Sequence, residues 1–556
     1  MADQRALDLL RRHEQMKDRR TNWETLWREV AERFLTRSDD FRTQHAPGEN
    51  RAEHVFDSFP TRALDRFASV LDSGLTPRNR RWFRLSTGDD DLDEQADVKH
   101  WLDLFGQKIW RKLYSARSNL ASHLHETYLS LGGFGTGCMH VEMNRMGDLV
   151  VRSPHLSQMH IAASQAGQID VFHREFMLEA RQAIQKFGRD APAKCFDMVR
   201  QGKPFTPFHF LHCVAPREDY DETRIGNNAT PLVEYYVSCD EKKIVREGGY
   251  DESPYMVSRY VLSPNEIYGR SPAIIHLADA KMLNRMMWTV LETAELAADP
   301  PALYPNDDLV GQYGIAPGER IMGGIDDQGR QLVQPFRSGA QPQIGLDMIA
   351  RVRDQIDDGM LGLYFRVLVE NPNMTATQAL LIAQQQGQMT SPAISRQQSE
   401  LLDPLIRAVA DGMAKRGEVP PMPESVRAYI EEVGEPIIVR YESPMVHAAE
   451  SDRGVAILRL LEAGAPLMEM DPSVRRAVKP LEMYQELAKS LGVPPRVLAS
   501  EEEMAAALEQ DEQQMAVAGA LEAAPVAAQA AKTIAETQAI ASNLPGAQPP
   551  AVPLVG

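Results

Sequence analysis

One glycine-rich loop in the chain has a composition that could hold a phosphate group, Gly132-Gly133-Phe134-Gly135-Thr136-Gly137. A phosphate cradle needs a strand before the glycines and a helix after them, because the N–H groups at the helix start bind the anion. Here a helical pattern precedes the loop, a strand pattern follows it, and no Gly-Lys-Ser/Thr sequence occurs. We therefore expect a helix-to-strand turn in which glycine allows positive φ or close backbone approach. An ATPase or nuclease that uses this loop is the enzymatic alternative.

The cysteines and histidines give little support to a metal site or a nucleophile. The four cysteines lie far apart without a Cys-x-x-Cys pair, so we expect reduced thiols, as in a cytosolic setting. His212 is next to Cys213, but side chains of adjacent residues rarely bind one metal ion. No Gly-x-Ser-x-Gly, His-Glu-x-x-His or EF-hand pattern occurs. We therefore expect no catalytic residue, no cofactor and no metal ion.

The charge of the chain argues against a protein that grips nucleic acid. The 556 residues are 43% hydrophobic and carry a formal net charge of −18, with a pI near 5.3. Proteins that bind DNA by neutralising phosphates are usually basic. A surface that surrounds DNA without gripping it remains compatible with this charge. The local basic clusters are typical of solvated helix faces or salt bridges, namely Arg11-Arg12, Arg19-Arg20, Arg78 to Arg84 and Arg475-Arg476.

Two long helical patterns flank a segment rich in glycine and proline. The first runs over about 272–298 and the second over about 346–365, both with apolar residues at a spacing of three or four. Each would be about 30–40 Å long at 1.5 Å per residue. The residues between them alternate apolar side chains with glycines, which predicts a small β module. A helix out, a β tip and a helix back form a projecting stalk, which suits assembly better than small-molecule chemistry.

The remaining patterns predict an α+β protein that is mainly helical. Helices are expected at about 3–36, 56–74, 95–114, 120–131, 178–187, 375–417, 446–463, 472–489 and 501–541. Strands are expected at 80–85, 139–143, 149–152, 168–176, 232–238, 255–262 and 436–442. We expect a solvated turn at 89–94, and we expect Gly387, Pro392 and Pro404 to kink the helix at 375–417. We expect neither a signal peptide nor a transmembrane helix.

Several stretches resemble one known family, the portal or head-to-tail connector proteins of short-tailed, podovirus-type phages. The most specific are Tyr268-Gly269-Arg270-Ser271-Pro272-Ala273 and Asp299-Pro300-Pro301. The others are Phe56-Asp57-Ser58, Arg62-Ala63-Leu64, Leu75-Thr76-Pro77, Trp82-Phe83, Ser118-Asn119-Leu120, Met374-Thr375-Ala376-Thr377 and Leu401-Leu402-Asp403-Pro404-Leu405. The resemblance covers about residues 5–490 of the chain.

The resemblance implies a ring, usually of twelve copies, at one vertex of the capsid. A terminase motor would pump double-stranded DNA in through the ring, and the DNA would later leave by the same channel. The fold would comprise a wing, a two-helix stem, a β-containing clip and a helical crown. These parts would be the wing at 1–270, stem helix 1 at 271–299, the clip at 300–344, stem helix 2 at 345–365, the tunnel loop at 364–374, the wing's long helix and strand at 375–445, the crown at 446–543 and a disordered tail at 544–556.

The resemblance also implies which residues form each functional surface. The tunnel-loop residues at the DNA channel would be Tyr364, Arg366, Val367, Leu368, Val369, Glu370, Asn371 and Asn373. The clip residues at the terminase or tail interface would be Asp307, Tyr313, Glu319, Arg320 and Arg330. The residues that pack the stem would be Leu283, Met287, Val290, Ile349, Val352 and Ile356.

The expected partners are further copies of the chain, the major capsid and scaffolding proteins, the terminase motor, tail adaptor or nozzle proteins and the DNA. We expect the protein in the virion, at the portal vertex, after assembly in the host cytoplasm and without a membrane. The other non-enzymatic hypothesis is a different virion component, such as a tail-tube adaptor or an internal protein.

Overall fold

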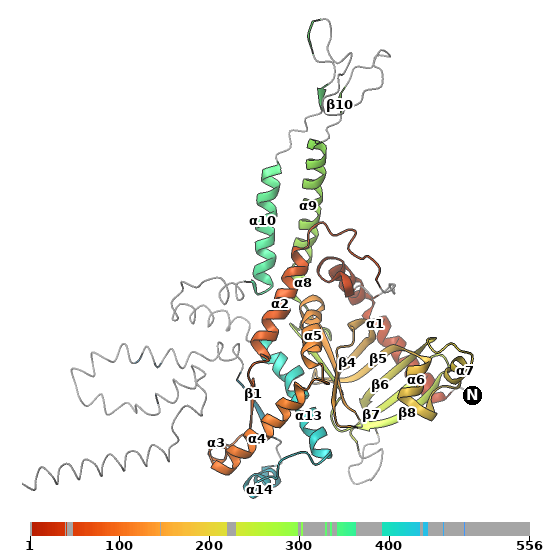
Figure 1. Cartoon of the computed structure of the whole chain (residues 1–556), viewed down its shortest axis with the longest axis vertical. Helices are drawn as coiled ribbons and strands as arrows, with labels where there is room; N and C mark the ends of the chain where they lie inside the picture. Colours follow the sequence, from red (N-terminus) through yellow and green to blue (C-terminus); the bar gives the residue numbers. More distant parts are fainter. Residues whose placement is uncertain are drawn as a thin grey trace, which may run out of the picture. The chain divides into compact units, whose positions relative to one another are not determined.

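The fold is a mixed arrangement of helices and sheets, seen in a computed structural model of the chain (Figure 1). The chain divides into two units, Met1–Ser451 and Asp452–Gly556. The structure describes residues 3–38, 41, 48–144, 146–218, 230–298, 302–303, 328–330, 334–335, 342–362, 392–433, 437–442, 457, 460 and 483. Nearly all of these belong to the first unit, so the fold below is that of the first unit.

The largest sheet has five antiparallel strands in the order β4-β5-β6-β7-β8. Each strand lies beside its neighbour in sequence, and the connection between β5 and β6 contains two α-helices. The strands are β4 (Met159–Ala163), β5 (Ile169–Glu179), β6 (Pro207–Pro216), β7 (Leu232–Ser238) and β8 (Lys243–Tyr250).

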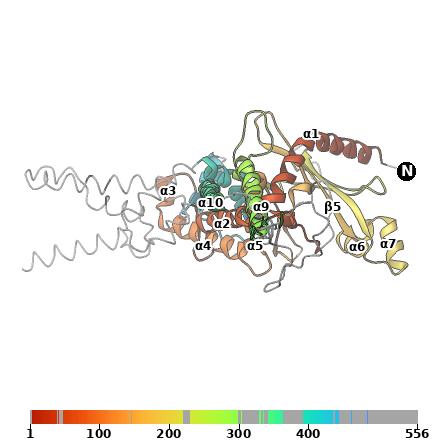
Figure 2. The same cartoon turned by 90° about the horizontal axis from the view of Figure 1, so that it is seen from above.

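Helices cover both faces of this sheet, as Figure 2 shows around β5. Successive side chains of a strand point to opposite faces. On β6, Phe208 and Phe210 pack with α6 (Ala180–Phe187) and α7 (Ala193–Arg200), whereas Leu211 and Cys213 pack with Ala6 of α1 (Gln4–Phe34). A strand covered on both faces has few polar positions, which explains the nearly continuous apolar sequence of β6.

A second core joins helices to a three-stranded antiparallel sheet of order β3-β2-β9. Gly132 lets α5 approach α2 closely, because a Cβ there would lie 2.5 Å from Cδ1 of Phe67. The indole N–H of Trp27 in α1 donates to the Phe134 carbonyl at 3.0 Å. The elements are α2 (Phe59–Leu75), α4 (Ala96–Leu113), α5 (Leu120–Phe134), β2 (Thr136–Met143), β3 (Leu149–Arg152) and β9 (Tyr255–Arg259).

Segments from after residue 391 complete this core. The strand β12 (Ile438–Tyr441) pairs antiparallel with β1 (Phe83–Ser86). Buried Arg259 of β9 forms an ion pair with Glu400 at 2.6 Å. Glu400 lies in a π-helical turn, η5 (Gln398–Leu402), followed by α13 (Asp403–Lys415) and α14 (Glu424–Val433). The turn falls just before Pro404, which has no N–H to donate to a helical bond, so the distortion expected at Pro404 is present, whereas Gly387 lies outside the described residues.

Two helices form an antiparallel hairpin, α9 (Leu277–Ala298) and α10 (Pro342–Gly359) (Figure 1). The short helix α8 (Pro272–Ile275) leads into α9. Strands β10 (Ala302–Leu303) and β11 (Gln334–Pro335) pair antiparallel in the segment between α9 and α10. The helices and the β pair fall where the sequence predicts a stalk.

Most elements expected from the sequence lie within a few residues of their predicted positions. Strands β4, β6 and β8 and helices α7 and α14 were not predicted, and 89–94 is not only a turn. The four-residue helix α3 (Asp90–Asp93) lies there, with the Asp89 carboxylate accepting from the N–H groups of Asp91 and Leu92. Buried Leu92 is the physical reason, because its contact with the core orders the acidic segment. The helices expected at 446–463, 472–489 and 501–541 lie almost entirely outside the described residues.

Candidate functional site

The inner faces of α9 and α10 hold the six residues expected to pack the stem. Leu283, Ile349, Val352 and Ile356 are buried in the main core, and Met287 and Val290 are half-buried against it. A Cβ on Gly345 would lie 2.9 Å from Val290, so the two helices are in close contact there. Fully burying an aliphatic side chain stabilises by about 1.5–3 kcal/mol, so these contacts hold the hairpin together.

Two ion pairs attach α10 to the body of the unit. Buried Asp57 accepts from the backbone N–H of Phe59 at 2.9 Å and pairs with Arg353 at 2.9 Å. One turn further along α10, Asp357 pairs with Arg66 of α2 at 2.9 Å. Both guanidinium groups lie near the Phe59 ring, at 5.5 Å for Arg66 and 5.9 Å for Arg353. The base of α10 is therefore fixed by polar and aromatic contacts together.

The start of the hairpin is attached to the glycine-rich loop. The Ser271 hydroxyl caps α8 by accepting from the Ile274 N–H at 3.0 Å, and it donates to the Gly133 carbonyl at 2.7 Å. Gly135 ends α5 with φ of 79°, and its N–H donates to the Leu131 carbonyl. A Cβ on Gly135 would lie 2.2 Å from the Gly269 carbonyl oxygen. The prediction of a helix-to-strand turn with close backbone approach is confirmed, and the loop serves packing at the entry to the hairpin.

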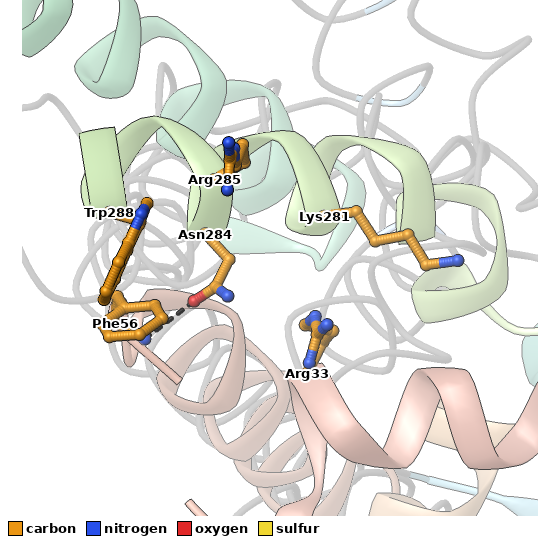
Figure 3. Close-up of a pocket in the computed structure, with 6 residues that line it drawn as sticks. All are labelled: Arg33, Phe56, Lys281, Asn284, Arg285 and Trp288. Carbon is orange, nitrogen blue, oxygen red and sulfur yellow. Dashed lines mark hydrogen bonds between the residues drawn. The ribbon is translucent and has the colours of Figure 1, made fainter. Parts of the chain in front are cut away.

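A small open pocket of about 290 Å³ lies beside α9 (Figure 3). Lys281, Asn284, Arg285 and Trp288 of α9 line it, together with Arg33 from the end of α1 and Phe56. The Asn284 side chain joins the two sides, accepting from the Phe56 N–H at 2.7 Å and donating to the His54 carbonyl at 2.9 Å.

This pocket was not predicted. Its signal in the sequence is the spacing of Lys281, Arg285 and Trp288 by four and three residues, which places them on one face of a helix. Arg33 and Phe56, which also line the pocket, precede these α9 residues by about 230 to 250 positions in the chain. Only the fold therefore brings the two groups together.

Large apolar side chains are exposed on both helices of the hairpin. On α9 they are Met282, Trp288, Leu291 and Leu296, and on α10 they are Leu346 and Met348, each 40–49% exposed. Single exposed apolar residues are ordinary on protein surfaces, but a series along two neighbouring helices is typical of a surface that contacts another protein.

Three buried histidines meet between α1 and the large sheet. The His13 ring lies 4.6 Å from His160 of β4 and 5.7 Å from His173 of β5, measured between centroids. Both ring nitrogens of His160 and one of His173 have no hydrogen-bond partner among the described residues. Burial is the main cause that lowers the pKa of His173, to about 3, and the charges of His13 and Arg12 add to it. Burial also lowers the pKa of His160, so the His160 and His173 rings are neutral in the folded protein near pH 7.

No group of three or more His, Cys, Asp or Glu in the described ranges could hold a metal ion. All four thiols are free, and burial raises the pKa of Cys138 to about 12. In the part of the chain that the structure describes, no helix has the length and hydrophobicity of a membrane span.

Most of the other expected site residues lie outside the described residues. This holds for the eight tunnel-loop residues from Tyr364 to Asn373 and for four of the clip residues, Asp307, Tyr313, Glu319 and Arg320. The fifth clip residue, Arg330, is exposed and donates a hydrogen bond to the side chain of Gln328.

Comparison with known proteins gives the family. A family model described as bacteriophage head to tail connecting protein matches residues 6–498. The probable portal protein of Bordetella phage BPP-1 is 27% identical over 524 residues, covering 92% of each chain. The portal protein of Salmonella phage epsilon15 is 26% identical over 554 residues, covering 97% of each chain.

A solved chain from the virion of a native gene transfer agent particle covers 78% of this chain and 95% of its own length. Its TM-score of 0.33 and identity of 12% are too low to support an argument.

The chain therefore belongs to the family of bacteriophage head-to-tail connecting proteins. This is a family of structural proteins, and the role of a connector implies partners in the capsid and the tail. The predicted resemblance to portal proteins is confirmed, and the alternative of a tail-tube adaptor or internal protein is not favoured.

Proposed function

We propose that this head-to-tail connector forms a closed ring of about twelve copies around an axial channel for double-stranded DNA. The observation that carries the proposal is the hairpin of α9 and α10, whose inner faces pack together while both outer faces expose large apolar side chains. A single copy leaves these side chains in water, whereas neighbours in a ring would cover them.

The parts of the ring follow the order of the chain. Residues 271–299 and 345–365 are the stem, 300–344 the clip and 364–374 the tunnel loop. Residues 1–270 and 375–445 are the wing, 446–543 the crown and 544–556 a disordered tail. The attachment of α10 to the body through Asp57 and Arg66 supports a stem that is rigidly held by the wing.

The net charge suits a channel through which DNA slides. Twelve copies at −18 carry a formal charge of −216. A strongly acidic ring repels the phosphates at short range and so prevents the DNA from sticking. The tunnel loop, with the charged residues Arg366 and Glu370, adds little attraction for phosphate.

The partners follow from this position at one vertex of the capsid. The clip binds the terminase motor during packaging and the tail adaptor or nozzle proteins afterwards, while the wing contacts the major capsid and scaffolding proteins. Assembly takes place in the host cytoplasm, and the ring then remains in the virion.

Electron microscopy of the purified full-length protein tests the proposal. Views down the symmetry axis should show a closed ring with a central channel of about 20 Å or more, the width that a duplex requires. Sedimentation of the same sample should give a mass near that of twelve copies. A protein that stays monomeric over the whole concentration range, and in virions, would contradict the proposal.

A further inference from the structure

The pocket beside α9 is positively charged in a chain that is acidic overall. Lys281, Arg285 and Arg33 bring three cations to it, while two carboxylates of α1 pair with two of them, Glu29 with Lys281 at 2.6 Å and Glu32 with Arg33 at 3.8 Å. Arg285 forms no ion pair with any described residue, and the buried Nε of Arg33 has no hydrogen-bond partner among them. The pocket therefore has positive charge left for an acidic partner.

The outer face of α10 has the complementary charge. Asp347, Arg351 and Asp354 are exposed along one ridge of this helix, and neither aspartate forms an ion pair within the described part of the chain. We call this ridge the acidic face of α10, and Lys281, Arg285 and Trp288 the basic face of α9. Each face lies opposite to the side of its helix that packs in the hairpin, because Leu283 and Val290 on α9 and Val352 and Ile356 on α10 point inward.

The two faces lie at the same height along the hairpin. A Cβ on Gly345 would contact Val290, and one on Gly359 would contact His276, which fixes the antiparallel register of the helices. In this register Asp354 lies level with Lys281, and Asp347 lies level with Trp288. Arg351 then lies level with Asn284, which is one turn of α9 from Trp288, and guanidinium groups stack favourably on exposed rings such as that of Trp288.

We propose that the pocket beside α9 receives the acidic face of α10 from the neighbouring copy of this chain. The inference rests on the proposed ring and names the contact that closes it. A ring generated by one rotation joins two different faces of the subunit. For a ring axis parallel to the hairpin, the rotation from one copy to the next does not change height, so level residues would meet. The two faces point away from each other within one copy, which allows the contact only between copies.

Disulfide trapping in the full-length protein tests this contact. The double variant Arg285→Cys/Ala350→Cys, made with Cys239→Ser, places one thiol on each face at the same height. Mild oxidation should produce a ladder of covalent multimers, because each copy offers both thiols to different neighbours. The single variants should form no ladder. The control Glu295→Cys/Ala350→Cys should form no ladder either. Its first thiol is also exposed on α9 but lies almost three helical turns beyond position 285, so it is not level with position 350.

Charge reversal gives a second measurement. Arg285→Glu and Asp354→Arg should each raise severalfold the protein concentration at which half of the copies are in rings. Their combination should restore assembly, because the pair is rebuilt in reverse. Rings that form normally in all these variants, without a covalent ladder, would overturn this contact but leave the ring itself intact. If the unmodified protein forms no ring at all, the proposed function fails first.

Discussion

At the scale of single residues, the buried histidines make the stability of the fold depend on pH. Burial is the main cause that lowers the pKa of four of them, His140, His160, His173 and His212, to about 3 for His173 and about 4 for His212. The usual pKa of histidine is about 6.5, so in the unfolded chain each ring gains a proton as the pH falls below that value. In the same pH range these histidines gain no proton in the folded protein. Acid therefore favours the unfolded state.

We expect the free energy of unfolding to fall by about 1.4 kcal/mol per pH unit for each of these histidines below pH 6.5. Urea titrations at pH 7.5 and pH 5.5 should show a clearly lower midpoint in acid. The variant His173→Gln should reduce the difference, whereas His54→Gln, at an exposed position, should not. Equal midpoints at the two pH values would contradict the prediction.

Residue patterns in the sequence could predict some of these features but not others. The order of helix, glycines and strand was enough to predict the turn at Gly135, because the local chain sets that geometry. The histidine cluster was not predictable, since His13 lies on a helix and His160 and His173 lie on two strands far along the chain. Only the packing of α1 on the sheet brings the three rings together.

At the scale of elements, the base of α10 depends on one buried carboxylate. Asp57 receives hydrogen bonds from Arg353 and from the Phe59 backbone, and its side chain is 1% exposed. Removing the Asp57 carboxylate would leave both donors without an acceptor. This would lower the free energy of unfolding by about 1–3 kcal/mol.

The variant Asp57→Ala should therefore loosen α10 locally. Hydrogen exchange followed by mass spectrometry should show faster exchange over 342–359, where the structure places this helix. The control Asp65→Ala removes an exposed carboxylate from α2 and should leave the exchange of α10 unchanged. Unchanged exchange of α10 in Asp57→Ala would show that the ion pair does not hold the helix.

The elements themselves were predictable to different degrees. Amphipathic helices such as α2 and α4 were found near their true bounds, because one face is buried and the other is exposed. Strand β6 was missed because both of its faces are covered, so its sequence does not alternate. The pairing of β1 with β12 could not be predicted either, since about 350 residues separate the two strands.

At the scale of the whole molecule, the proposed ring leads us to expect the DNA contact in residues 364–374, the proposed tunnel loop. Residues 366–372 read RVLVENP and carry one positive and one negative charge. If this neutral segment only constrains the DNA, it can be removed without affecting the contacts between copies elsewhere in the proposed ring.

Deleting 366–372 should therefore leave ring assembly intact while reducing the amount of DNA packaged or retained in particles. Ring formation can be checked by electron microscopy, and packaged DNA by its resistance to nuclease. A control deletion of 546–556, within the proposed disordered tail, should change neither. Normal packaging and retention in the loop deletion would mean that the tunnel loop lies elsewhere in the chain.

The sequence by itself determined the helices of the hairpin, the β pair between them, the role of the glycine-rich turn and the family of the protein. These depend on local periodicity, on backbone preferences and on motifs spread over nearly the whole chain. Only the tertiary structure decided which groups meet at the hairpin. Asp57 finds Arg353, and Arg33 and Phe56 complete a pocket on α9, across 230 to 300 residues of chain. Such contacts follow from how faces pack in three dimensions, and no linear spacing records them.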